Sequence, residues 1–474
     1  MKRSRLMVTA LLVAGWAGAA DGAAVLSVDS LSAVGTAPVS TGIAVVGTPD
    51  SARINLSREE CVRIALESNP TIRVADMEIE RMDYSKKETL AALFPTLDFS
   101  LAYQRSIELQ TIKMNMGGSS QAIKMGSDNS WNMGFNVAVP LIAPTLWKSL
   151  DLADTQILKT VESARASRLD MVHAVNSAYY TLMLALASKD VLQQNYDNAK
   201  FNAEMYEKKF KVGTASEYDV LRSSVQVKNV EPELLQADIA IRQAELQLKM
   251  LMGMNAEVMI RPDVTLKDLQ SDMYAHTNIL NTDISDNTSL RSLDIDTKLL
   301  SQTVEMKKRA FIPTVAATFN LAWSSLSNGN MFKNIDLNPY STVGVSISVP
   351  LFSGGSRYYG LKQAKVQLAE MQFQRENLVN NLNMQVSLAV DNINKEARQI
   401  DTNAEGVRQA VKAHEIMKKS FEVGAATYLD LRDSELAETQ AQLAYYQAVY
   451  NYLVSVSELD LLLGRDNTGS VVVK

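Results

Sequence analysis

The sequence predicts a mixed α and β fold in which strands of membrane-spanning length continue into long helices, and in which this arrangement occurs twice. The segment KKFKVGTASEYDVLRSS around Gly213 returns about 211 residues later as KKSFEVGAATYLDLRDSE around Gly424. Two regions have a hydrophobic period of about two residues, which is typical of strands. Each is followed by about 68 residues without a proline, enough for a helix of roughly 100 Å.

The first 24 residues have the pattern of a secretory signal peptide. Basic residues come first, an apolar run follows over residues 6–15, and small residues surround Ala17-Gly18-Ala19. The protein is therefore expected to leave the cytoplasm. No later apolar run approaches the roughly 18 to 20 residues of a membrane helix, so a crossing of the bilayer would use strands. Residues 25–53 lack a helical period, which indicates a flexible N-terminal leader.

Charge and cysteine content narrow the possible partners. The formal net charge is -6 and no basic cluster is present, so nucleic acid is not an expected partner. Cys61 is the only cysteine in the chain and cannot form an internal disulfide. We interpret it as a packed apolar residue of a helix.

The first repeat is predicted over residues 54–286. Ser57 and Glu60 form a predicted capping box, and Asn69-Pro70 ends this helix before a second one begins. Apolar and polar residues then alternate, as in LDFSLAYQ and WNMGFNVAV, which predicts two strands separated by a polar loop. The expected segments are a strand hairpin at about 95–140 with its loop at 106–129, a long helical hairpin at about 145–253, and a last segment at 256–286.

The second repeat is predicted over residues 287–465, with a C-terminal tail at 466–474. A helix comes first, then a strand hairpin at about 313–351 with a polar loop at 324–339, then a long helical hairpin at about 356–463. Each of the four strands is long enough to cross a bilayer when tilted. Aromatic side chains near the strand ends are expected at the membrane interface: Tyr103, Trp131, Trp323 and Tyr340.

Four membrane strands cannot close on themselves. An open sheet edge in lipid leaves backbone groups unpaired at several kcal/mol each, so the chain is expected to oligomerise. Two copies would supply eight strands, whose interior side chains fill, and three copies would supply twelve, which is wide enough for a channel.

These residues and their order resemble the TolC family of outer-membrane efflux and secretion channels. The resemblance covers about residues 55–465 and rests on the opening NLSREECVRIALESNP, the two helix-to-strand joints at residues 94–96 and 312–314, the segment VPLFSGGSR, and the duplication itself. It implies a homotrimer with a 12-stranded transmembrane β-barrel continuous with a periplasmic α-helical barrel, and an equatorial segment at 256–286. It also implies export across the outer membrane by docking with a periplasmic adaptor and an inner-membrane transporter.

The two Val-Gly turns are the expected tips of the helical hairpins. Gly213, Asp219 and Gly424 mark the turn and its expected adaptor contact. Asp430 and Asp433 lie one helical turn apart and match the aspartate rings of the family, so we expect a periplasmic gate or selectivity ring there. A solvated acidic helix face is the alternative. In the first repeat, Arg222 replaces the second carboxylate, which favours the second tip as the gate.

One expected feature of the tip is absent from this sequence. The resemblance implies a closing Tyr and Arg on the second hairpin, and these positions hold Phe421 and Ala426. The expected closure is therefore either absent or built differently here.

No residue pattern indicates catalysis, a metal or a cofactor. His173, His276 and His414 lie far apart without partners at metal-ligand spacing, and the SGG segment at 353–355 lacks the ending of a phosphate loop. Two other classes of protein are alternatives to an outer-membrane channel. A periplasmic adaptor would carry a lipoyl-like β domain, and a secreted coiled-coil protein would not need alternating strands that end in aromatic residues.

Overall fold

The structure is a computed structural model that describes residues 53–116, 119–268, 282–330 and 335–465. The predicted signal peptide, nearly all of the leader, the C-terminal tail and His276 lie outside these ranges. Among the helices within them, none combines the length and the apolar character needed to cross a membrane.

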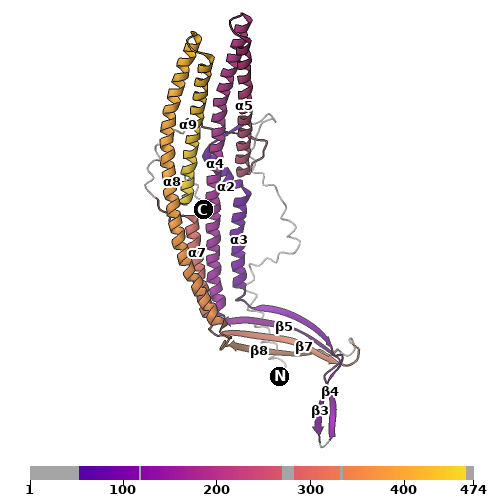
Figure 1. Cartoon of the computed structure of the whole chain (residues 1–474). Helices are drawn as coiled ribbons and strands as arrows, with labels where there is room; N and C mark the ends of the chain where they lie inside the picture. The colour runs from indigo at the N-terminus through magenta and orange to yellow at the C-terminus, as the bar shows by residue number, and fades with distance from the viewer. Residues whose placement is uncertain (1–52, 117–118, 269–281, 331–334, 466–474) are drawn as a thin grey trace. The chain divides into compact units, whose positions relative to one another are not determined.

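Strands and helices follow the order expected from the two repeats, with one helical hairpin after each pair of long strands (Figure 1). The first part of the chain contains β1 (Arg53–Leu56), α2 (Arg58–Ser68), α3 (Pro70–Ala91), β2 (Thr96–Arg105), β3 (Gln110–Met116), β4 (Ser119–Met125), β5 (Asn129–Ile142), α4 (Pro144–Lys211), α5 (Glu217–Met252) and β6 (Met259–Pro262). The second contains α7 (Thr288–Arg309), β7 (Thr314–Ser327), β8 (Asn338–Ser348), α8 (Ser356–Glu422) and α9 (Tyr428–Leu462).

The four long strands form one antiparallel sheet in the order β2-β5-β7-β8. The first strand hairpin therefore joins the second through β5 and β7, and β2 and β8 are the two edges. Directly paired residues point to the same face of a sheet, so the alternation seen in the sequence is continued from strand to strand. The sheet thus has one apolar and one mainly polar face.

Two short pairings were not predicted from the sequence. The polar segment expected to be a loop at 106–129 contains an antiparallel hairpin of β3 and β4. β1 pairs in parallel with β6, so Arg53 belongs to a strand rather than to the leader. Both strands of this second pair have four residues and join segments about 200 residues apart, which no local pattern reveals.

The long helices form two antiparallel hairpins, α4 with α5 and α8 with α9, and α4 also packs against α9 (Figure 1). α4 has 68 residues and α8 has 67, so each extends roughly 100 Å from the sheet toward its Val-Gly turn. α3 and α7 pack on the parts of these helices next to the sheet. The two tips therefore lie at the ends of the hairpins that are remote from the sheet.

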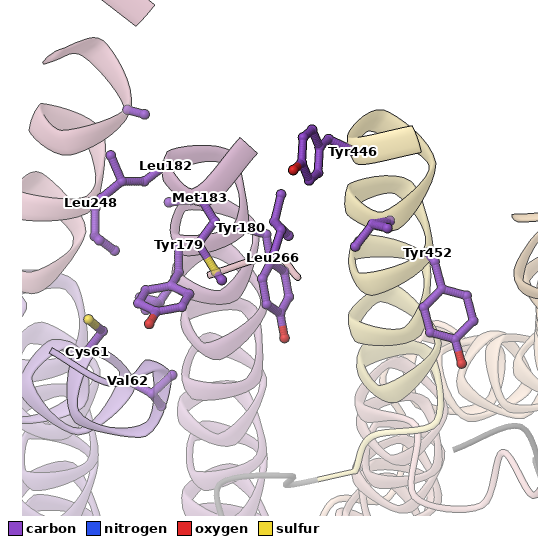
Figure 2. Close-up of a cluster of buried hydrophobic side chains, with 14 of the residues drawn as sticks. Cys61, Val62, Tyr179, Tyr180, Leu182, Met183, Leu248, Leu266, Tyr446 and Tyr452 are labelled. Atoms are coloured by element: carbon purple, nitrogen blue, oxygen red, sulfur yellow. The ribbon is translucent and has the colours of Figure 1, made fainter. Parts of the chain in front are cut away.

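A hydrophobic core joins both hairpins to the short helix α2. Figure 2 shows this cluster, with Cys61 and Val62 of α2 beside Tyr179 of α4, and with Tyr446 and Tyr452 on α9. The capping box predicted at Ser57 and Glu60 is confirmed and begins α2. The Cys61 side chain is fully buried, and burial raises the pKa of its thiol to about 12. It is a packing residue, as its sequence context indicated.

The joint between helices is built twice in the same way. Asn69 caps α3 and donates from Nδ2 to the carbonyl of Leu251 at the end of α5, at 2.8 Å. Asn287 caps α7 and donates to the carbonyl of Leu462 at the end of α9, also at 2.8 Å. The internal duplication is therefore preserved in the contacts that connect the helices as well as in the order of elements.

Candidate functional site

The tips of the two hairpins have the same backbone. Gly213 and Gly424 have positive φ angles of 79° and 75°, which is the left-handed region that favours glycine. In the first turn the amide of Gly213 donates to the carbonyl of Phe210, and in the second the amide of Gly424 donates to that of Phe421. A Cβ added at either glycine would meet no atom within 4 Å. These glycines are needed for the turn and not for close packing.

Each tip continues into a helix that begins with a capping box. The Ser216 and Asp219 side chains exchange hydrogen bonds with each other's backbone amides at the start of α5. Thr427 and Asp430 do the same at the start of α9. The side-chain hydrogen bond from Ser216 holds the pKa of Asp219 below its usual value, and the one from Thr427 does the same for Asp430. Both carboxylates stay ionised at neutral pH and stabilise their helix ends.

Asp433 lies one turn farther along α9 than Asp430, and both are exposed. Asp433 accepts a hydrogen bond from Arg432 Nη2 at 2.9 Å. Within the described structure, each single chain therefore presents the two predicted gate carboxylates on the surface near the second tip. A role for them as a ring depends on copies around an axis.

Four side chains from four helices form what we call the inter-hairpin cluster: Tyr206, Arg222, Phe421 and Tyr428. The ring centroids of Tyr206 and Tyr428 lie 5.1 Å apart in an edge-to-face arrangement, and those of Tyr206 and Phe421 lie 6.4 Å apart. The guanidinium of Arg222 lies 5.8 Å from the ring centroid of Tyr428. Such aromatic and cation–π contacts each contribute about 0.5–1.5 kcal/mol beyond burial. The cluster holds the first hairpin against the second.

The sequence does not reveal this cluster, although Phe421 stands where the resemblance implies a tyrosine. Tyr206 and Tyr428 break the repeat, because the residues at the corresponding places in the other copy are Met417 and Glu217. A search for positions where the two copies differ could have found both. It could not have shown that they meet, because this depends on the rotation of each helix about its axis.

The cluster leads to a first prediction. Tyr206→Ala removes the central ring, so the two hairpins should separate more readily near their tips, with a cost of about 3 kcal/mol or more. Spin labels on the two tips, measured by pulsed electron resonance, should show a longer and broader distance. Tyr206→Phe keeps the ring and should leave the distance unchanged; an equal change in both variants would mean that the ring does not hold the hairpins.

The predicted interfacial aromatics divide between the two faces of the sheet. Tyr103 is paired with Trp131, with ring centroids 4.7 Å apart, and Trp323 shares their face. Tyr340 is paired with Ala322 and therefore lies on the opposite, mainly polar face. Tyr340 and Val343 lie three residues apart in β8, and side chains an odd number of positions apart point to opposite faces of a strand. Val343 is paired with Phe319 on the apolar face, so Tyr340 lies on the other face.

The described residues contain no cluster of His, Cys, Asp or Glu suited to a metal ion. Nδ1 of His173 lies 3.1 Å from the Ser457 hydroxyl, which connects α4 with α9. His414 contacts Glu438 on α9. Both described histidines thus connect helices.

Comparisons with known proteins agree with this fold. The sequence matches the outer membrane efflux protein family over residues 61–254 and 280–465. It is 20% identical over 423 residues to the outer membrane protein TolC of Vibrio cholerae, which covers 89% of this chain and 93% of that protein. It is 22% identical over 417 residues to the alkaline protease secretion protein AprF of Pseudomonas aeruginosa, covering 85% and 83% of the two chains.

The fold is also similar to that of a solved channel. The Campylobacter jejuni CmeC outer membrane channel superposes with a TM-score of 0.66 at 17% identity, over 86% of this chain and 85% of that one. The resemblance to the TolC family and the expected outer-membrane location are thereby confirmed. Because the family match spans most of the sequence, the chain belongs to the outer membrane efflux protein family, whose members are channels of the outer membrane rather than enzymes.

Proposed function

We propose that three copies of this chain close into a 12-stranded transmembrane barrel and a periplasmic helical barrel, forming one continuous duct. The edges of the sheet support this arrangement. Within the described residues, β2 and β8 each pair on one side only, and in lipid each unpaired backbone group costs several kcal/mol. Pairing of β8 with β2 of the next copy removes both edges. Twelve strands leave room for cargo, whereas eight are filled by their own side chains.

The two faces of the sheet carry this proposal. Directly paired residues form rows across the four strands. Two adjacent rows, whose residues are neighbours in sequence, are apolar in one case and polar in the other. One row is apolar: Leu97, Val137, Phe319 and Val343. The next row is polar: Asp98, Asn136, Asn320 and Thr342. An apolar face toward lipid and a polar face toward water are what a barrel around an aqueous lumen requires. Tyr103, Trp131 and Trp323 then form part of the interfacial band.

The helices have a matching unpartnered surface. Large apolar side chains repeat at intervals of four, seven or ten residues, which keep them on one helix face, along the exposed side of α5: Leu221, Val225, Leu235, Ile239, Leu246 and Met250. In a soluble periplasmic segment such a stripe is normally covered. A helix of the neighbouring copy would cover it, which closes the helical barrel as pairing of β8 and β2 closes the sheet.

The duct is proposed to work between an inner-membrane transporter and a periplasmic adaptor that contacts the tips at Gly213, Asp219 and Gly424. Its cargo is proposed to be small molecules or proteins. Relatives named for alkaline protease secretion and for cation efflux are similar to this chain over most of its sequence, so we infer that this shared framework does not select cargo. Selection would then lie with the transporter and the adaptor.

The assembly can be tested directly. The protein purified in detergent should have the mass of three chains, and in planar bilayers it should form single channels. A protein that stays monomeric and soluble without detergent would contradict the proposal. Chemical crosslinking in the native cell, followed by purification, should recover an adaptor and a transporter with it.

Asp430 and Asp433 are proposed to form carboxylate rings at the periplasmic entrance. Opposite charges about 4 Å apart attract by about 1 kcal/mol in water, and several carboxylates around one axis add to this attraction. The double variant Asp430→Ala with Asp433→Ala should therefore weaken block of the channel by Mg²⁺ about tenfold or more.

The control for this prediction is Asp391→Ala. Asp391 is exposed on α8 and lies 31 residues before Glu422, or about 47 Å along the helix. This variant should keep the native block. If the double variant is blocked as strongly as the native channel, these aspartates do not line the entrance.

A further inference from the structure

Three ionisable side chains meet between the helices of the second hairpin. His414 of α8 lies between Glu435 and Glu438 of α9, and the three side chains are only 13%, 11% and 20% exposed. His414 Nδ1 contacts a carboxylate oxygen of Glu438. His414 Nε2 lies 3.8 Å from Oε1 of Glu435. Both ring nitrogens therefore face carboxylates in a place with little water.

The same group connects the two hairpins. Asn202 of α4 is buried and donates from Nδ2 to Oε1 of Glu435 at 3.3 Å. Glu435 lies seven residues, or two helical turns, beyond Tyr428 of the inter-hairpin cluster. Glu435 is thus the carboxylate at which α4, α8 and α9 meet. We call His414, Glu435 and Asn202 the polar joint.

The charges around Glu435 come from two of these helices. His414 and Lys418 face it from α8, and Glu438 faces it from α9. From α4 it meets Asn202, which carries no charge. Burial raises the pKa of Glu435 above its usual value, although His414, Asn202 and Lys418 act in the opposite direction.

Whether the contact between His414 and Glu435 is attractive depends on one proton. When a hydrogen on Nδ1 lets His414 donate to Glu438, Nε2 of the neutral ring carries a lone pair. A proton held either at Nε2 or at Glu435 makes their contact attractive, although the 3.8 Å between Nε2 and Oε1 is too long for a hydrogen bond. Without this proton, a lone pair and a carboxylate face each other in a poorly hydrated place, which costs free energy.

We propose that the polar joint is a proton-dependent clasp, which holds the second hairpin against the first when it retains this proton and weakens when it loses it. The proposal deepens the proposed function, because it assigns a regulation to the gate at the tips. The direction of the pH effect follows from the burial of Glu435. The closed joint binds the proton more tightly than the separated hairpins do, so separation releases it and is favoured as pH rises.

The distance between the tips measures this directly in the full-length trimer. Spin labels are placed on Thr214→Cys and Ala425→Cys, with labelled chains diluted in unlabelled ones. Native Cys61 needs no replacement, because it is buried and the pKa of its thiol is about 12. As pH rises above about 4.3, the usual pKa of a glutamic acid, the separated fraction should rise by up to about tenfold per pH unit, the limit for one released proton per chain, until the pH passes the raised pKa of Glu435 in the closed joint.

Glu435→Gln should keep the tips together and remove the pH response, because glutamine retains the shape and a hydrogen-bond acceptor without titrating. His414→Gln tests the same joint from α8. His414 lowers the pKa of Glu435, so its loss should move the pH response to higher pH without removing it, and the test does not depend on one variant folding. Glu415→Gln is the matched control: this residue is exposed beside His414, and its variant should respond like the native chain.

The outcomes separate this proposal from the channel itself. A tip distance that is constant with pH in the native protein, or that changes equally in native and Glu435→Gln chains, would overturn the clasp. Channels in planar bilayers report independently on the proposed function. A trimer that conducts but shows no pH-dependent distance contradicts only the clasp, whereas absence of conducting channels contradicts the duct.

Discussion

Replacing Phe319 by arginine is expected to prevent most of the protein from assembling in the membrane. Phe319 lies on the apolar face of a central strand, between Val137 and Val343. If this face meets lipid, a charged side chain near the middle of the bilayer costs about 2–4 kcal/mol. In a trimer the cost occurs three times. The assembled fraction should therefore fall by more than tenfold.

The matched control is the next residue along the same strand. Asn320 lies between Asn136 and Thr342 on the polar face, and Asn320→Arg should assemble normally while altering conductance. Both variants are folded into lipid vesicles from urea, and the fraction of chains assembled as trimers is quantified by native electrophoresis. Equal assembly of the two variants would contradict the assignment of the lipid-facing and water-facing sides of the sheet. A greater defect in Asn320→Arg would reverse that assignment.

Gly464→Ala should strongly destabilise the joint at the end of α9. Gly464 has a φ of 65°, and a Cβ there would lie 2.0 Å from the carbonyl oxygen of Asp286. The same turn accepts a hydrogen bond from Arg165 at 2.8 Å, and the adjacent Asn287 binds the carbonyl of Leu462. Backbone strain of about 1–2 kcal/mol adds to overpacking of about 1–3 kcal/mol, so a loss of about 2–5 kcal/mol is expected.

Gly424→Ala isolates the contribution of crowding. Its φ of 75° imposes a similar strain, but no atom lies within 4 Å of the added Cβ. Its loss should be limited to about 1–2 kcal/mol. The urea midpoint of the trimer in detergent compares the two variants. If both midpoints shift equally, contact of the added Cβ with Asp286 does not contribute to the destabilisation caused by Gly464→Ala.

Most of the fold was predictable because its signals are local. The alternation from Leu97 to Tyr103 determines a strand and its two faces, since successive side chains of a strand point in opposite directions. Gly213 and Gly424 identify both turns, because few other residues adopt positive φ without strain. Comparison of the two copies then extended these local signals to the whole chain.

The short strand pairs were not predictable in this way. β3 and β4 lie in a segment rich in Gly, Ser, Met and Asn, whose composition resembles a loop. β1 and β6 have four residues each, too few for a periodic pattern, and they pair across about 200 residues. Such strands are stabilised by a partner that only the folded chain brings near.

Some features of the candidate site were likewise predictable from local sequence, and others were not. The sequence by itself determined where the tips are, that Asp430 and Asp433 share a helix face near the second tip, and that Phe421 and Ala426 exclude the expected closure. Only the tertiary structure decided what connects the hairpins. Asn202 and Glu435 are 233 residues apart, and Tyr206 meets Tyr428 across a similar separation. The rotation of each long helix brings these side chains together, and that rotation depends on packing along the whole helix rather than on any local pattern.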